Sequence, residues 1–172
     1  MRLGRMKGKE AVTAALVALV MAALAAWRGE DPSLPSTGMV ERVYDGDTLL
    51  VNAGVKLKVR VLGIDTPEKD GPYTKAEPFG AEATARMKSL AEGRVVTLDY
   101  AGEETHDKYG RTLAYVILPG GESAGELLLA EGLAEVFRRA RHPLKARYEE
   151  LQARARAACR GMWRARCAHK AH

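Results

Sequence analysis

The sequence predicts a small α+β domain in which a barrel of short antiparallel strands is covered by helices. The strands are indicated by short β-prone runs separated by tight-turn dipeptides such as Asp45-Gly46, and by strict alternation of apolar and basic residues over 55–61. The helices are indicated by apolar residues at helical spacing with capping residues at the ends. About 135 residues are enough for one core of this kind.

The N-terminal residues 1–26 are expected to be an export signal. Basic residues up to Lys9 precede an uncharged run from Ala11 to Trp27, with an A-x-A cleavage site at residues 23–25. A cleaved signal peptide is favoured over an uncleaved membrane anchor, and either one places the remaining chain outside the cytoplasm. Residues 27–38 contain acids, prolines and glycine and are expected to be a linker.

Five strands are expected, at residues 39–43, 48–51, 55–61, 95–100 and 112–118. In the alternating run, one face is apolar and is expected to point into a core, and the other face is basic. The apolar set is Val55, Leu57, Val59 and Val61, and the basic set is Lys56, Lys58 and Arg60.

Three helices are expected between and after these strands. The first covers 79–91, where Pro78 suits the first helical position and Gly93 suits the C-terminal cap. Ser123 and Glu126 form a capping box for the second, which ends at Gly132. The third begins at Pro143 and runs to a cap near Gly161. The expected order is therefore β-β-β-α-β-β-α-α.

The charge distribution and the two cysteines limit the classes of protein to which the chain can belong. The net charge of +5 comes from 27 Lys and Arg against 22 Asp and Glu, but acids dominate residues 26–137 and bases dominate residues 138–172. Two cysteines cannot form a disulfide framework. Cys159 and Cys167 would be too far apart on one continuous helix, but they could pair in an oxidising compartment if the chain folds back near Gly161.

Three clusters at strand ends carry the residue types that phosphodiester chemistry needs. They are Asp45-Gly46-Asp47-Thr48, Asp65-Thr66-Pro67-Glu68 and Asp107-Lys108-Tyr109-Gly110-Arg111. Each cluster alone is also typical of a turn. Together, the carboxylates of Asp47, Asp65 and Glu68, with the backbone carbonyl of Thr66 between the last two, suit Ca²⁺ or Mg²⁺.

Two further residue types complete a hydrolytic set. The guanidinium groups of Arg60 and Arg111 match phosphate oxygens and would stabilise charge that builds up in the transition state. Glu68 could accept a proton from water or position it. We interpret the set as an apparatus for metal-assisted hydrolysis of phosphodiesters.

Several ordered motifs resemble the staphylococcal-nuclease-like, or thermonuclease, family. The resemblance covers about residues 39–163, leaving 164–172 as a basic C-terminal tail. The motifs are residues 43–48 (VYDGDT), 60–68 (RVLGIDTPE), 79–83 (FGAEA), 107–115 (DKYGRTLAY) and 131–134 (EGLA). Such motifs in order are far more specific than any one of them alone.

The resemblance implies a five-stranded OB-fold-type barrel with three helices. It also implies a Ca²⁺-dependent endonuclease that holds one ion, cuts DNA and RNA and leaves 3′-phosphate ends. Asp47, Asp65 and the Thr66 carbonyl would be calcium ligands. Glu68 would be the candidate general base, and Arg60 and Arg111 would contact the reacting phosphate. By the same resemblance, Lys108 and Tyr109 would touch the nucleotide and Asp107 would have a supporting role.

One departure concerns the base pocket, and one alternative concerns the function. Where the best-known family member has two tyrosines, this chain has Arg138 and Ala140, so base preference stays open. The run 138–141 could bind phosphate or be a solvated loop.

Related barrels also occur as non-catalytic nucleic-acid-binding modules, but the complete set of acids and arginines favours the enzyme. A monomer without a stable protein partner is expected, touching a membrane only through an uncleaved N-terminal segment.

Overall fold

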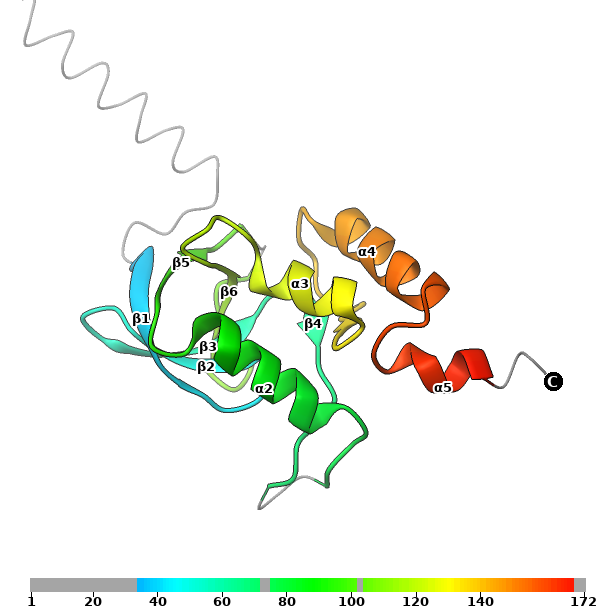
Figure 1. Ribbon diagram of the computed structural model, residues 1–172. Coiled ribbons are helices and arrows are strands. Elements are labelled where there is room, and N and C mark those ends of the chain that lie inside the picture. Colours follow the sequence, from blue (N-terminus) through cyan, green and yellow to red (C-terminus); the bar gives the residue numbers. More distant parts are fainter. Residues whose placement is uncertain (1–33, 72–74, 102–103, 169–172) are drawn as a thin grey trace, which may run out of the picture. The chain divides into compact units, whose positions relative to one another are not determined.

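The computed structural model describes residues 34–71, 75–101 and 104–168 (Figure 1). The expected signal peptide or anchor and most of the linker lie outside the described residues. Within the described part of the chain, no helix is both long and apolar enough to span a bilayer.

The predicted five-stranded barrel is confirmed, and its strands close in the order β1-β2-β3-β6-β5. Their bounds are Thr37–Val43 (β1), Thr48–Asn52 (β2), Lys56–Val61 (β3), Val95–Asp99 (β5) and Thr112–Ile117 (β6). The expectation that every pair is antiparallel is wrong at one junction, where β3 and β6 run parallel. Tight hairpins impose antiparallel pairing, but a long connection separates these two strands and permits the parallel arrangement.

The alternation in β3 separates the barrel core from its outer surface. Val59 and Val61 are buried in the core, whereas Lys56 and Lys58 are exposed. Val55 does not join the core face as expected, because β3 begins one residue later and Val55 lies in the preceding turn with 57% of its surface exposed.

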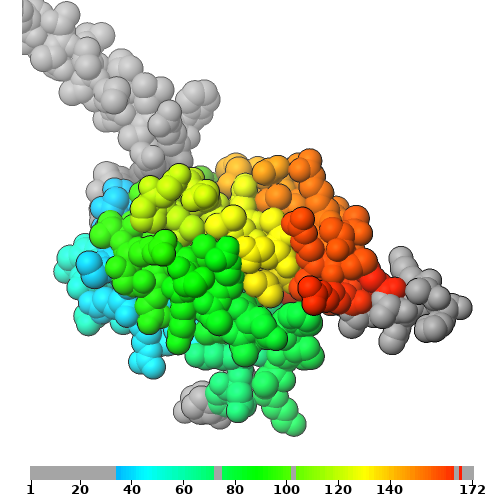
Figure 2. Space-filling model, in the orientation of Figure 1, coloured from blue at the N-terminus to red at the C-terminus, as the bar shows by residue number. Residues whose placement is uncertain are grey.

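Three helices of eight or more residues pack beside the barrel: α2 (Gly80–Ala91), α3 (Ala124–Glu131) and α4 (Lys145–Ala157). The helix α3 contacts both α2 and α4, and the space-filling view shows the three as one continuous surface (Figure 2). The predicted caps of α3 are confirmed. The Ser123 hydroxyl accepts the Glu126 N–H, and Gly132 ends the helix in the left-handed conformation at φ 72°.

The last predicted helix, from Pro143 to a cap near Gly161, is shorter than expected, and a further short helix follows it. The helix α4 ends at Ala157, and a short helix α5 (Trp163–Ala168) follows. Cys159 and Gly161 between them both have φ 50°, which is incompatible with a continuing helix. A disulfide joins Cys159 to Cys167 with a Cα–Cα distance of 6.0 Å, so it ties α5 back to the end of α4.

A second, two-stranded sheet was not anticipated. The strand β4 (Ile64–Asp65) pairs antiparallel with β7 (Glu135–Val136), and Asp65 lies opposite Glu135. This pairing fixes the chain after β7 beside the acidic segment that follows β3.

Candidate active site

The three strand-end clusters converge on one cleft of about 820 Å³. Its lining is dominated by charged side chains of both signs. The acids are Asp45, Asp47, Asp65, Glu68, Glu104 and Asp107, and the cations are Arg60, Lys108, Arg111, Arg139 and Arg141. The cleft therefore contains every carboxylate and guanidinium that the sequence indicated for chemistry.

Asp47 is the most deeply anchored acid of the cleft. It is only 3% exposed, and its Oδ2 accepts hydrogen bonds from the backbone N–H and the hydroxyl of Thr66 at 2.9 and 3.0 Å. Its Oδ1 accepts the Thr48 hydroxyl at 3.1 Å. These bonds tie the turn before β2 to the segment after β4, so the two acidic clusters meet.

Glycine is required in this turn because of close packing. A Cβ atom built on Gly46 would lie 2.7 Å from Thr66 Oγ1 and 2.9 Å from Ala83 Cβ. Atoms do not approach so closely without displacement. The Asp45-Gly46-Asp47 turn can therefore lie against Thr66 and α2 only without a side chain at its centre.

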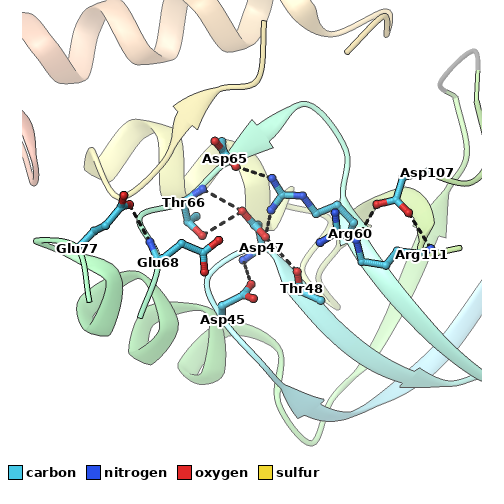
Figure 3. Close-up of polar contacts among 10 residues, drawn as sticks. All are labelled: Asp45, Asp47, Thr48, Arg60, Asp65, Thr66, Glu68, Glu77, Asp107 and Arg111. Carbon is cyan, nitrogen blue, oxygen red and sulfur yellow. Dashed lines mark hydrogen bonds and ion pairs between the residues drawn. The ribbon is translucent and has the colours of Figure 1, made fainter. Parts of the chain in front are cut away.

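Arg60 bridges the two acids expected to hold a metal. From β3 its guanidinium forms an ion pair with Asp47, and its Nη2 donates to Asp65 Oδ1 at 2.5 Å (Figure 3). The β2–β3 register sets this geometry, because Thr48 lies opposite Arg60. Three segments of the chain thus share one network of opposite charges.

Two carboxylates at this end of the cleft are of the type that a hard cation accepts as ligands. Asp47 and Asp65 both direct oxygen atoms at a single positive group, the Arg60 guanidinium. Among the described residues, no three His, Cys, Asp or Glu side chains gather as a ligand set. The donors suit an ion that accepts backbone carbonyl oxygen and water beside a few carboxylates, as Ca²⁺ and Mg²⁺ do.

Glu68 lies beside these acids, in a segment that is hydrogen-bonded to Glu77 just before α2. Its N–H donates to the Glu77 carboxylate at 3.0 Å, and its carbonyl accepts the Glu77 N–H at 2.8 Å. Partial burial, reinforced by the negative charge of Asp45, raises the pKa of Glu68. Its carboxylate points toward Asp45 and Asp47 (Figure 3), where a raised pKa suits a group that accepts a proton.

Arg111 is held by a carboxylate of its own loop. Its Nε donates to Asp107 Oδ2 at 2.6 Å, while Asp107 Oδ1 accepts the backbone N–H groups of Tyr109 and Arg111, each at 2.9 Å. Burial opposes ionisation of Asp107, but these hydrogen bonds outweigh it and lower the pKa of the carboxyl. Asp107 therefore orients the loop and its arginine.

Lys108 and Tyr109 also line the cleft. Tyr109 is 72% exposed, and Lys108 Nζ and Arg111 Cζ lie 4.9 Å and 5.5 Å from the centroid of its ring. An exposed ring among cations suits contact with a nucleotide.

The segment after β7 forms one wall of the cleft. The sequence alone did not decide whether this segment binds phosphate or is a solvated loop. Arg139, Ala140 and Arg141 line the cleft, whereas Arg138 is not among the lining residues. Phe137, which was not singled out, is 40% exposed and also lines the cleft. It is held there because its N–H donates to the Gly63 carbonyl at 2.9 Å next to the β4–β7 pair. A two-residue strand has no periodicity that could have revealed this placement.

Comparison with known proteins finds a family model and several relatives that match this chain. Residues 58–165 match the family model described as staphylococcal nuclease homologue. The chain is 40% identical to a thermonuclease of Staphylococcus hyicus over 129 residues, 74% of this chain and 75% of that protein. It is 35% identical to an uncharacterized endonuclease of Escherichia coli over 127 residues, 73% of this chain and 76% of that protein. It is 42% identical to endonuclease YncB of Bacillus subtilis over 98 residues, 56% of this chain and 46% of that protein.

Proposed function

This chain belongs to the family of staphylococcal nuclease homologues, and from that premise we propose that it is an exported, calcium-dependent endonuclease of DNA and RNA. Its relatives named thermonuclease and endonuclease support the coarser statement that it is a hydrolase acting on phosphodiester bonds. The metal, the two substrates and the export are the finer parts of the proposal.

One observation carries the proposal above all: Asp47, Asp65, Glu68, Arg60 and Arg111 line a single cleft. A module that only binds nucleic acid needs cations and aromatic rings, but it has no use for a buried carboxylate beside a proton-accepting glutamate. The non-catalytic alternative is therefore disfavoured.

The arginines would hold the phosphate that reacts. Arg111 is fixed through its Nε by Asp107, and its two terminal nitrogens have no hydrogen-bond partner among the described residues. A guanidinium presents a fork that matches two phosphate oxygens, and it stays charged at any working pH. Arg60 approaches from β3, so the two groups would stabilise negative charge on the phosphate as it develops.

Glu68 would serve the attacking water. Its raised pKa lets the carboxylate take a proton from water more readily than an ordinary glutamate, and its segment is fixed by Glu77. Asp47, Asp65 and the Thr66 carbonyl would hold Ca²⁺, which when bound polarises a phosphate oxygen and helps water to ionise. Attack by water with departure of the 5′ oxygen would leave a 3′-phosphate.

A metal screen with product analysis tests this function. The purified full chain is incubated with single-stranded DNA or RNA in Ca²⁺, Mg²⁺ or chelator, with Glu68→Gln as the control variant. We expect cutting in Ca²⁺, loss of cutting in chelator and products that carry 3′-phosphates. Equal cutting in chelator would refute the mechanism.

Export is proposed on two grounds. The N-terminal segment has the pattern of a signal, and the Cys159–Cys167 disulfide suits an oxidising compartment. Mass spectrometry of the exported protein should find a new N-terminus near Ala26. An intact N-terminus in the membrane fraction would instead identify an anchor.

The enzyme is proposed to act as a monomer without a stable protein partner. Light scattering of the purified protein should give the mass of one chain, 18.7 kDa before any cleavage. A concentration-independent dimer would contradict this part of the proposal.

A further inference from the structure

An aromatic ring outside the cleft lies between two cations on the outer surface of the barrel. Arg42 Cζ is 5.4 Å and Lys58 Nζ is 5.3 Å from the centroid of the Tyr44 ring. Arg42 and Lys58 are exposed and Tyr44 is half-buried. Each cation is attracted to the ring, so the ring keeps two like charges together that would otherwise repel.

The strands hold the two cations, Arg42 and Lys58, in fixed positions. The β1–β2 register shifts between Val40 and Arg42, and this irregularity leaves Arg42 exposed while Val43 remains in the core. Leu50 of β2 lies opposite Arg42 on one side and opposite Lys58 on the other. The two cations are therefore anchored in one row across three strands.

The positive charge here is uncompensated, unlike that of several other surface cations. Lys56 pairs with Glu41 at 3.0 Å, and Arg86 pairs with Glu131 at 2.6 Å. Arg42 and Lys58 have no carboxylate partner within residues 34–71, 75–101 and 104–168. A pair of exposed cations without acids favours an anion that can contact both.

The row continues directly into the cleft. Tyr44 immediately precedes Asp45, which lines the cleft, and Lys58 lies two residues before Arg60 on the same face of β3. Two residues along a strand span roughly 7 Å. A chain of phosphates that has one member at Arg60 can therefore reach Lys58 and Arg42 without leaving this surface.

We propose that Arg42, Tyr44 and Lys58 form a second site that binds the phosphate backbone of a nucleic-acid strand as it leaves the cleft. Arg42 and Lys58 contact the phosphates, and Tyr44 acts as a positioning residue that holds the two cations. The site rests on the proposed function, because the strand it binds is the substrate of the cleft. It reads no base, so it adds affinity for long strands irrespective of sequence.

Binding of strands of two lengths tests this site. Fluorescence anisotropy is measured with the full chain in chelator, using a single strand of about 20 nucleotides and a dinucleotide, over a range of salt concentrations. For Arg42→Ala/Lys58→Ala we expect about tenfold weaker binding of the long strand and unchanged binding of the dinucleotide. The slope of log K against log salt should fall by about 1.4, since each phosphate contact on a single strand contributes about 0.7.

A matched control removes two charges elsewhere. Lys88→Ala/Arg164→Ala loses the same charge from exposed positions on α2 and α5 and should bind both ligands like the parent. Tyr44→Leu should weaken long-strand binding by two- to threefold, with no effect on the dinucleotide. Unchanged binding by Arg42→Ala/Lys58→Ala, or equal loss in the control, would overturn the proposal.

The outcome is separable from that of the proposed function. Cutting of a short substrate by the parent protein in Ca²⁺ tests the cleft alone. If the parent cuts nothing, the proposed function fails, while the binding comparison still decides whether the outer site exists.

Discussion

The two arginines of the cleft are held in different ways. Arg60 contacts Asp47 and Asp65, which come from other segments, and its side chain is 14% exposed. Arg111 contacts Asp107 of its own loop, four residues away, and its side chain is 25% exposed. Arg60 is thus part of the network that joins the barrel strands to the acidic segment. Arg111 belongs to a loop that is held by hydrogen bonds among its own residues.

Because of this difference, the effect of losing each arginine on the reaction should be distinguished from its effect on stability. Both guanidinium groups are aimed at the same cleft, so losing either should impair the reaction in a similar way. Only Arg60 neutralises a buried carboxylate, because Asp47 is almost wholly enclosed and Asp107 is less so. We therefore expect the two arginines to have equal weight in catalysis but unequal weight in stability.

The largest expected effect is on the rate. Arg60→Lys and Arg111→Lys should each lower kcat/KM on single-stranded DNA by about 100- to 1,000-fold, because lysine cannot present a fork to phosphate. Steady-state kinetics in Ca²⁺ measure this, with circular dichroism as the folding control. If either variant kept more than a tenth of the parent activity, that arginine would be removed from the site.

The next largest effect is on the free energy of unfolding, which should differ between substitutions of Arg60 and of Arg111. Without a divalent ion, Arg60→Ala should lower the free energy of unfolding by about 3 kcal/mol, since it leaves the buried Asp47 without its cation. Arg111→Ala should cost less than about 1 kcal/mol, because the side chains of Arg111 and Asp107 are 25% and 16% exposed against 14% and 5% for Arg60 and Asp47, so solvent screens the Arg111 pair more. Urea denaturation measures both, and equal losses would contradict the distinction between the two arginines.

A smaller effect is expected at the carboxylate that orients Arg111. Asp107→Asn should lower kcat/KM by about tenfold, because the loop keeps its backbone path while Arg111 loses its charged partner. Asp107→Glu should recover part of the loss, which a purely structural role would not predict. Kinetics on the same substrate compare the two variants.

The last effect needs no substitution in the parent protein and concerns the pH profile, in which Glu68 and Asp107 should behave differently. The pKa of Glu68 is raised by burial and neighbouring acids, whereas hydrogen bonds lower the pKa of Asp107. A base must be deprotonated, so kcat/KM should fall about tenfold per pH unit below the pKa of Glu68, which lies above the ordinary glutamate value. Asp107→Asn should leave this limb in place, and a limb that persists in Glu68→Gln would exclude Glu68 as the base.

Local patterns in the sequence were sufficient for most of the elements. The alternation around Val59 and the two caps of α3, Ser123 at its start and Gly132 at its end, depend only on neighbouring residues. Both predictions are confirmed. The parallel β3–β6 pair and the β4–β7 pair were missed, because long connections and two-residue strands leave no periodic signal.

The candidate site shows the same limit. The residue types and their order along the chain indicated phosphodiester chemistry, but the Arg60 bridge and the need for Gly46 arise from contacts between distant segments. Phe137 enters the cleft wall only through the unforeseen pairing of β7. Composition and spacing cannot reveal such contacts, since they depend on how the elements pack.

The most direct test of the account is a crystal structure of Glu68→Gln with Ca²⁺ and a short single-stranded oligonucleotide. The account predicts one ion on Asp47, Asp65 and the Thr66 carbonyl, with Arg60 and Arg111 on the same phosphate. A phosphate bound away from both arginines, or an ion held elsewhere, would contradict it.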